Sequence, residues 1–257
     1  MIHTTAIIHP GAKIGDNVEI GSYSVIGNNV GLGEGTSIGS HVVISGPCKI
    51  GKNNRIYHHC SIGEDPQDKK YRGEAESVLE IGDGNIIREF CSINRGTASG
   101  GGITRLGNAN WIMAYVHIAH DCLIGNTNVF ANNTTLSGHV IIDDYVILGG
   151  FTGVHQFCRI GKHSFSAIAS VIVKDVPPYL LVAGNTAKPN GLNREGLLRH
   201  GMEQARIDLL RKAYKILYRD GLSLKDAIAS LDLLASESGD IAIFADFIKA
   251  STRGIVR

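Results

Sequence analysis

Aliphatic residues recur at an interval of six along most of the chain. A first run of this frame extends from Ile14 to Ile62, a short second run covers 81–93, and the longest run extends from Leu106 to Ile160. Glycine often follows the aliphatic leader, and the fifth position of each hexad is usually small or β-branched. A period of six fits neither a helix nor continuous strand alternation. It predicts a short strand and a turn in each hexad.

Three such units can close one triangular coil, so that equivalent positions lie eighteen residues apart in the sequence. Successive coils would stack at strand spacing, about 4.8 Å, with the leaders filling the interior. A β-sandwich would instead show strands of variable length without a fixed frame. The frame predicts a mainly β protein, a parallel β-helix of hexapeptide repeats. It does not determine the handedness, since right-handed crossovers dominate in proteins generally.

Two stretches interrupt the frame, and a third ends it. Polar or Gly-rich segments near 63–79 and 95–104 predict loops that leave the β-helix, and long loops on a rigid scaffold often carry function. The hexads stop near Val173, and Pro177-Pro178 is expected to prevent further regular pairing.

Helical spacing replaces the hexads after position 193, where apolar residues from Leu197 to Ile216 recur at intervals of three and four. We therefore expect a β-helix domain at 1–190 and a small α-helical domain at 191–257. The flat sides of a three-faced prism favour packing against copies of the same chain, most simply as a homotrimer.

Composition narrows the range of functions. The formal net charge of +1 argues against a general nucleic-acid binder, and 32 glycines indicate many tight turns. The N-terminal segment lacks the features of a signal peptide, and no apolar stretch approaches the ~18 residues of a transmembrane segment. We expect a soluble cytoplasmic protein.

The five cysteines all occupy one slot of the hexad, four places after a leader: Cys48, Cys60, Cys91, Cys122 and Cys158. This slot holds small residues, so the thiols are expected to be buried hydrophobic groups rather than disulfides or metal ligands. No two are eighteen residues apart, which predicts that none stack on adjacent coils.

Five histidines fall in the longest run of hexads, at 117, 120, 139, 155 and 163. His120, Gly138 and Gln156 are eighteen residues apart, so we expect them to form one column on consecutive coils. His139 and His155 each lie one place from that column, on opposite sides. This clustering predicts a functional site.

Two chemistries fit the cluster. In the first, His120 is a general base whose tautomer is fixed by Asp121, and the Gly138 N–H stabilises an oxyanion. In the second, His117, His120 and His139 bind zinc, as in hexapeptide-repeat enzymes of the carbonic anhydrase type. The spacing alone leaves both open.

Longer motifs cover essentially the whole chain: HIAHDC (117–122), LSGHVIIDD (136–144), GGFTGVHQFCRIG (149–161), DVPPYLLVAGN (175–185), LNREGLLRHG (192–201), the loop GEDPQDKKYRGE (63–74) and the final STRGIVR. They closely resemble the UDP-N-acetylglucosamine O-acyltransferases, the LpxA family. The resemblance implies a left-handed β-helix. It also implies an enzyme without cofactor or metal that moves a 3-hydroxyacyl chain from acyl carrier protein to the 3-hydroxyl of UDP-N-acetylglucosamine, the first step of lipid A biosynthesis.

The resemblance further implies roles for individual residues. His120 would take the proton from the sugar hydroxyl, Asp121 would support it, and the Gly138 N–H would bind the oxyanion formed on the thioester carbonyl. The implied substrate-binding residues are Asp68, Lys70, Asn94, His117, His139, His155, Gln156, Asn193, Glu195 and Arg199.

Three further positions bear on specificity. Asn94 stands where some family members carry a histidine, so it can hydrogen-bond but never becomes positive. Phe165 and Ile168 match the floor of the family's acyl-chain groove, and Ile168 replaces a small residue of the long-chain members. The resemblance therefore implies a shorter acyl chain.

A basic stripe at helical spacing lies in the C-terminal domain: Arg211, Lys212, Lys215 and Arg219. One hypothesis is that it helps to dock the acidic acyl carrier protein by charge complementarity. An ordinary solvated helix face explains the same pattern equally well.

Overall fold

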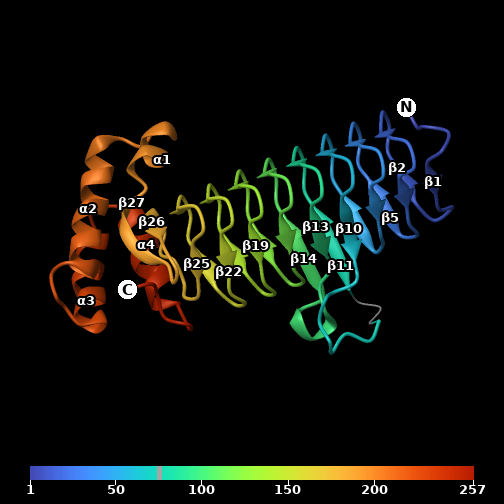
Figure 1. Cartoon of the computed structure of the whole chain (residues 1–257). Helices are drawn as coiled ribbons and strands as arrows, with labels where there is room; N and C mark the ends of the chain where they lie inside the picture. Colours follow the sequence, from blue (N-terminus) through green and yellow to red (C-terminus); the bar gives the residue numbers. More distant parts are fainter. Residues whose placement is uncertain (74–76) are drawn as a thin grey trace.

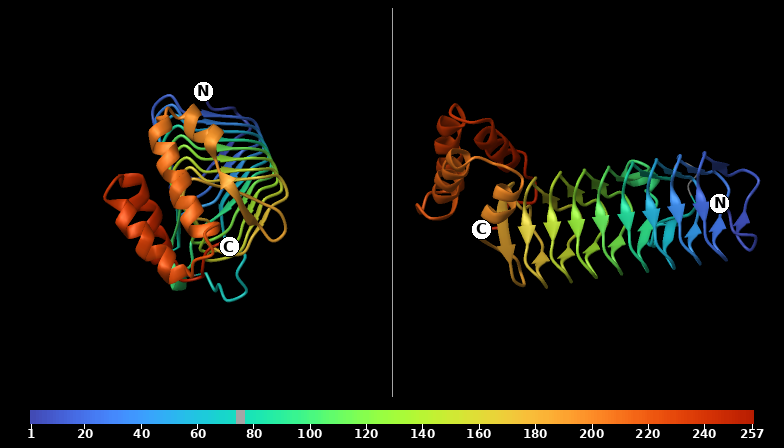
Figure 2. Two further views of the ribbon diagram at one scale, coloured as in Figure 1. Left: turned by 90° about the vertical axis from the view of Figure 1, so that its left-hand side faces the viewer. Right: turned by 90° about the horizontal axis from the view of Figure 1, so that it is seen from above.

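The chain forms a long triangular coil whose C-terminal end is covered by helices (Figure 1). The structure is a computed structural model that describes residues 1–73 and 77–257; residues 74–76, within the predicted first loop, lie outside the described part. Each turn of the coil adds one short strand to each of three sheets, which run side by side along the axis (Figure 2). The predicted parallel β-helix is confirmed.

The strands of the three sheets alternate along the chain. The first sheet contains β1 (Ile7–Ile8), β4 (Val25–Ile26), β7 (Val43–Ile44), β10 (Ser61–Glu64), β13 (Ser92–Asn94), β16 (His117–Ile118), β19 (Thr135–Leu136), β22 (Gly153–Val154) and β25 (Val171–Ile172). The second contains β2 (Lys13–Ile14), β5 (Val30–Leu32), β8 (Cys48–Ile50), β11 (Val78–Ile81), β14 (Ile103–Leu106), β17 (Leu123–Ile124), β20 (Ile141–Ile142) and β23 (Arg159–Ile160). The third contains β3 (Glu19–Ile20), β6 (Ser37–Ile38), β9 (Arg55–Ile56), β12 (Ile86–Ile87), β15 (Trp111–Ile112), β18 (Val129–Phe130), β21 (Ile147–Leu148), β24 (Phe165–Ser166), β26 (Leu180–Ala183) and β27 (Lys188–Leu192).

The hexad leaders fill the interior of the coil. Ile118 pairs with Leu136 and Leu136 with Val154 in the parallel ladder of the first sheet, so the eighteen-residue repeat holds there. All three side chains are buried. The coil also starts earlier than the predicted frame, because Ile8 ends β1 and Ile2 bridges to Ile20.

The two predicted loops leave the coil between β10 and β11 and between β13 and β14, where the short 3-10 helix η1 (Ala98–Gly100) lies. The first loop changes the local repeat, because Ser61 pairs with Ser92 rather than with a residue eighteen positions later. Cys60 and Cys91 therefore lie on adjacent coils. The prediction that no two cysteines stack is wrong for this pair, since the inserted loop lengthens that coil. All five cysteines are free and buried, as expected.

The corners of the coil hold non-glycine residues with left-handed backbone conformations. In the corner that follows the first sheet, Asp121, His139 and Phe157 have φ of 61°, 62° and 65°. A left-handed residue allows the chain to bend sharply from one sheet to the next. These side chains consequently form a row along one edge of the prism.

The coil continues beyond Pro177-Pro178, contrary to the sequence expectation. β26 pairs in parallel with β24, and β27 then closes the third sheet as an antiparallel strand. Proline lacks a backbone N–H, but both prolines precede β26 and remove no hydrogen bond from its ladder. Position 190, the expected domain boundary, lies within β27.

The C-terminal residues form α1 (Arg194–Arg199), α2 (Gln204–Tyr218), α3 (Leu224–Ala235) and α4 (Gly239–Lys249). These helices cover the last coil, and buried Tyr179 donates a hydrogen bond to Asp240 of α4 across 2.9 Å. Asp175 accepts a hydrogen bond from Ser251 at 2.7 Å and bridges to Ile255, which returns the chain end to the coil. Within the described residues, the helices are too short or too polar to span a membrane.

Candidate active site

His120 and Asp121 form a hydrogen-bonded pair at the corner that follows β16. His120 Nδ1 lies 2.8 Å from Asp121 Oδ2. The Asp121 side chain is 1% exposed and the His120 side chain 15%. Because an ionised carboxylate only accepts hydrogen bonds, Nδ1 carries the ring hydrogen and Nε2 is left as the acceptor. The pair therefore presents a base to its surroundings.

Asp121 is held by the second loop. Thr97 donates to Oδ1 from its backbone N–H at 2.8 Å and to Oδ2 from its hydroxyl at 2.7 Å. The Asp121 N–H in turn donates to the Thr104 hydroxyl at 2.8 Å. Burial raises the pKa of Asp121, but hydrogen bonds from His120 and Thr97 outweigh it and hold the pKa below its ordinary value. The carboxylate stays ionised and fixed in position.

Gly138 lies directly beside the His120 ring. A Cβ atom at Gly138 would fall 2.6 Å from His120 Cε1 and 2.9 Å from Nε2, so a side chain would collide with the imidazole. Within the described residues, no group accepts a hydrogen bond from the Gly138 N–H. The predicted stacking of 120 on 138 is thus present, with a free donor next to the base.

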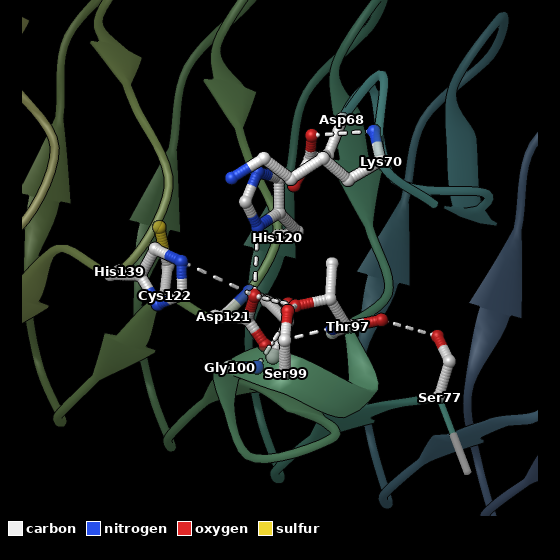
Figure 3. A network of polar contacts seen from close by, with 12 residues as sticks. Asp68, Lys70, Ser77, Thr97, Ser99, Gly100, His120, Asp121, Cys122 and His139 are labelled. Atoms are coloured by element: carbon white, nitrogen blue, oxygen red, sulfur yellow. Dashed lines mark hydrogen bonds and ion pairs between the residues drawn. The ribbon is translucent and has the colours of Figure 1, made fainter. Parts of the chain in front are cut away.

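A groove of about 660 Å³ opens beside this pair. The loop between β10 and β11 supplies one wall, and residues from three coils with Ser99 of η1 supply the rest. The lining residues are Gln67, Asp68, Lys69, Lys70, Ser99, His120, His139, Gln156 and Phe157. In Figure 3, Asp68 and Lys70 lie on the side of His120 that points away from Asp121. His139 lies to the left of Asp121 in the same view.

Burial lowers the pKa of both His139 and His117. Burial lowers the pKa of His139, and nearby Asp121 offsets only part of that effect. Burial, followed by the charge of His120, lowers the pKa of His117. His117 does not line the groove; its Nδ1 lies 2.8 Å from the Ser92 hydroxyl on the first sheet.

The first loop is tied to the coil by Asn94 and Arg95. The Asn94 side-chain amide donates to the Asp65 carbonyl at 2.7 Å. The Arg95 guanidinium, 8% exposed, contacts the Gly63 carbonyl and the Asp65 carboxylate. Asn94 therefore supports the loop in this structure, and its expected contact with substrate stays a prediction.

The remaining predicted residues lie elsewhere on this chain. His155 is exposed, with its Nδ1 3.3 Å from Arg253. Asn193 caps α1: its amide oxygen accepts from the Gly196 N–H at 3.2 Å, and its amide nitrogen donates to the His163 carbonyl at 2.9 Å.

Glu195 and Arg199 are exposed on α1, at the edge of the prism opposite the loops (Figure 1). Phe165 faces outward from β24, and Ile168 is 71% exposed in the following corner. Within the described residues, neither lines the groove beside His120. The predicted site thus divides into two groups on different edges of one chain.

The residues that could bind zinc differ from the expected set of His117, His120 and His139. His120, Asp121 and His139 offer ligand atoms that all lie within 4.8 Å of one another, whereas His117 is not part of this group. A solenoid zinc enzyme built on three histidines does not match this geometry.

Comparisons with known proteins decide the family. Residues 175–256 match the family described as UDP-N-acetylglucosamine O-acyltransferase, domain 2, and residues 1–34 and 103–138 match the bacterial transferase hexapeptide repeat. The acyl-[acyl-carrier-protein]–UDP-N-acetylglucosamine O-acyltransferase of Thiobacillus denitrificans is 56% identical over 100% of this chain and 99% of its own. The chain belongs to this O-acyltransferase family. The family member of Herminiimonas arsenicoxydans is 52% identical over 100% of this chain and 99% of its own.

Solved structures of the O-acyltransferase family agree. The Francisella novicida UDP-N-acetylglucosamine acyltransferase superposes with a TM-score of 0.98 at 48% identity, covering 100% of this chain and 94% of that one. The Arabidopsis UDP-N-acetylglucosamine acyltransferase gives a TM-score of 0.86 at 38% identity, covering 100% of both chains. The family resemblance found in the motifs is confirmed over the whole chain.

Sequence reasoning missed the residues that support the site. Thr97 and Thr104 hold Asp121, and Arg95 holds the first loop. The segment NRGT, at the start of the second interruption of the frame, could have drawn attention to Arg95 and Thr97. The residues that they contact are remote in sequence, so the contacts themselves could not be predicted from the sequence.

Proposed function

We propose that this protein transfers a 3-hydroxyacyl chain from acyl carrier protein to the 3-hydroxyl of UDP-N-acetylglucosamine, the first step of lipid A biosynthesis, in the cytoplasm. The observation that carries the proposal is the His120–Asp121 pair with Nε2 facing a groove beside the unpartnered Gly138 N–H. Family membership supports both substrates.

In the proposed reaction, His120 Nε2 removes the proton from the sugar hydroxyl as its oxygen attacks the thioester carbonyl. The resulting imidazolium is stabilised by the ionised, buried Asp121 carboxylate. The Gly138 N–H donates to the tetrahedral oxyanion. When that intermediate collapses, the thiol of the carrier leaves and takes the proton from His120.

Substrate binding is proposed to involve two chains. Asp68, Lys70, His139 and Gln156 line the groove, whereas Asn193, Glu195 and Arg199 lie at another edge of the same chain. For both groups to hold one nucleotide sugar, they must come from neighbouring copies. The guanidinium of Arg199 suits a diphosphate by charge and geometry.

The outer surface of the third sheet supports a homotrimer. Its outward positions on six successive strands are apolar: Ile86, Trp111, Val129, Ile147, Phe165 and Leu181. Trp111 is 44% exposed in the single chain. A long apolar face of this kind marks an interaction surface. On that arrangement, Phe165 and Ile168 would contribute to an acyl-chain groove between copies.

The basic stripe on α2, which could dock acyl carrier protein, is partly neutralised by acidic neighbours. Arg211 forms an ion pair with Asp208 at 2.9 Å, and Lys215 approaches Asp220 at 3.8 Å, which offsets their positive charge. A solvated face therefore remains an equal explanation of this stripe.

The deciding test is the variant His120→Ala, assayed with acyl carrier thioester and UDP-N-acetylglucosamine. Loss of the base should lower kcat by about 10²–10⁴-fold, while circular dichroism stays unchanged. As the matched control, His41→Ala alters an exposed histidine of another corner and should retain full activity. Undiminished turnover by His120→Ala would rule out the proposed mechanism.

A further inference from the structure

We propose that Zn²⁺ binds reversibly between His120, Asp121 and His139 and switches the proposed transferase off. These three residues are the one group of histidine, cysteine and acidic side chains within 1–73 and 77–257 whose ligand atoms all lie within 4.8 Å of one another. The inhibitory consequence rests on the proposed function, whereas the binding itself does not.

The distances suit a small ion with nitrogen and oxygen ligands. Asp121 Oδ2 lies 2.8 Å from His120 Nδ1 and 3.7 Å from His139 Nε2. A tetrahedral zinc site with bonds of about 2.0–2.1 Å needs its ligand atoms roughly 3.3 Å apart. The third pair, the ligand nitrogens of His120 and His139, lies within 4.8 Å. Side-chain rotations would bring all three pairs to the required separation. The fourth position can be filled by water from the groove that His120 and His139 line.

The surroundings of Asp121 suit a metal-ligating carboxylate. Its side chain is 1% exposed and is held by the Thr97 N–H and hydroxyl. Hydrogen bonds to a ligating carboxylate fix its orientation and strengthen such sites. The metal would therefore bind to a rigid carboxylate rather than order a mobile one.

Zinc at this position would stop catalysis through the tautomer of His120. In the free protein, Nδ1 carries the hydrogen and Nε2 accepts the substrate proton. Coordination of zinc to Nδ1 transfers that hydrogen, through solvent, to Nε2. The ring stays neutral, and the proton count is unchanged. Nε2, which lies close to Gly138, then has no lone pair with which to take a proton from a hydroxyl.

Selectivity follows from the donor set. Two imidazole nitrogens and one carboxylate favour Zn²⁺, whereas Mg²⁺ prefers oxygen ligands in an octahedron. Zn²⁺ is therefore expected to inhibit and Mg²⁺ to have no effect. A chelator should restore activity, because no covalent bond of the protein is changed.

The test measures zinc affinity of the full-length protein by competition with a chromophoric zinc chelator, without substrates. Wild type should bind one equivalent. His139→Gln and Asp121→Asn should each weaken binding at least tenfold, because each removes one of the three ligands. His59→Gln is the matched control: this exposed histidine stacks on His41 at another corner of the coil and should leave the affinity unchanged. Thermal unfolding curves verify that the variants are folded.

Equal affinity in wild type and His139→Gln would overturn the site, and so would loss of binding in His59→Gln. In the activity assay, wild type should lose turnover in step with zinc occupancy and regain it with chelator. Zinc binding that depends on His139 supports the site even in a protein without acyltransferase activity. Failure of the zinc site and failure of the proposed function are therefore distinguishable.

Discussion

At the scale of single residues, the site depends on one buried carboxylate. Asp121 accepts hydrogen bonds from His120 and from two groups of Thr97, and its own N–H donates to Thr104. The bonds from Thr97 orient the Asp121 carboxylate, which in turn fixes the tautomer of His120. The bond to Thr104 holds the Asp121 backbone. The left-handed conformation of Asp121 places this carboxylate at the corner, next to the groove.

We expect Asp121→Asn to lower kcat by roughly 10²–10⁴-fold with little change in KM, because the amide keeps the shape of the carboxylate but neither fixes the His120 tautomer nor stabilises the imidazolium. Steady-state kinetics of purified protein measures both constants. Asp144→Asn, at another corner, serves as the control for a comparable loss of charge. A wild-type kcat in Asp121→Asn would contradict the role assigned to the carboxylate.

At the scale of elements, a regular β-helix carries two irregular loops that help to form the groove beside His120. The first loop brings Asp68 and Lys70 to the groove, and the second brings Thr97 to Asp121. The described residues of the two loops contribute nothing to the hydrophobic core, so the loops depend on polar contacts with the coil. Arg95 provides the principal contact for the first loop.

The variant Arg95→Met should raise the KM for UDP-N-acetylglucosamine about tenfold, with a smaller effect on kcat. Methionine fills the space but cannot donate to Gly63 and Asp65, so the wall that carries Lys70 is no longer held, at a cost of about 1–3 kcal/mol. Arg105 is exposed and lies 3.0 Å from Glu80, so Arg105→Met should change neither constant. Equal KM values for both variants would disprove the anchoring role.

The junction between the coil and α1 should make the protein sensitive to acid. Burial, followed by the charge of His200, lowers the pKa of His163 to about 4, while an unfolded histidine has a pKa of about 6.5. The unfolded chain therefore binds more protons between these values. The free energy of unfolding should fall as the pH drops from about 6.5 to about 4 and then level off.

Urea unfolding at several pH values would measure this effect. The variant His163→Phe keeps an aromatic ring against Tyr145, whose ring centroid lies 4.7 Å away, but it cannot be protonated. Its stability should lose less between pH 6.5 and 4 than that of wild type. His41→Phe is the control at an exposed corner, and an identical pH dependence of His163→Phe and wild type would refute the prediction.

At the scale of the whole molecule, one chain holds only part of the proposed site. The groove beside His120 lies at one edge of the prism, and α1 with its cap Asn193 lies at another (Figure 1). Glu195 and Arg199 belong to this helix. The apolar outer surface of the third sheet provides a surface on which copies can meet. Assembly would then be a condition of activity.

Mixing two inactive variants tests this arrangement. His120→Ala and Arg199→Ala each disable one half of the site, so each pure protein should be inactive or nearly so. In randomly mixed trimers, about one site in four would combine two intact halves, and activity should recover to about a quarter of wild type. Unfolding and refolding the proteins together exchanges the subunits. A mixture as inactive as its components would show that both halves act within one chain.

The hexad frame determined the architecture without reference to tertiary structure, because a period of six admits few arrangements other than a stacked coil. It also placed His120 over Gly138, since within an uninterrupted run the register depends only on counting residues. The motifs identified the family because they are local in sequence and specific to it.

Only the tertiary structure decided which residues support the base and which edge carries each half of the site. The second loop brings Thr97 to Asp121, and the first loop brings Asp65 to Arg95. The conformation of an inserted loop does not follow from the repeat. The same insertion stacks Cys60 on Cys91, against the count of eighteen. Within a strict repeat, the pairing of strands on adjacent coils follows from counting residues. An inserted loop changes that count, and its own conformation depends on tertiary contacts.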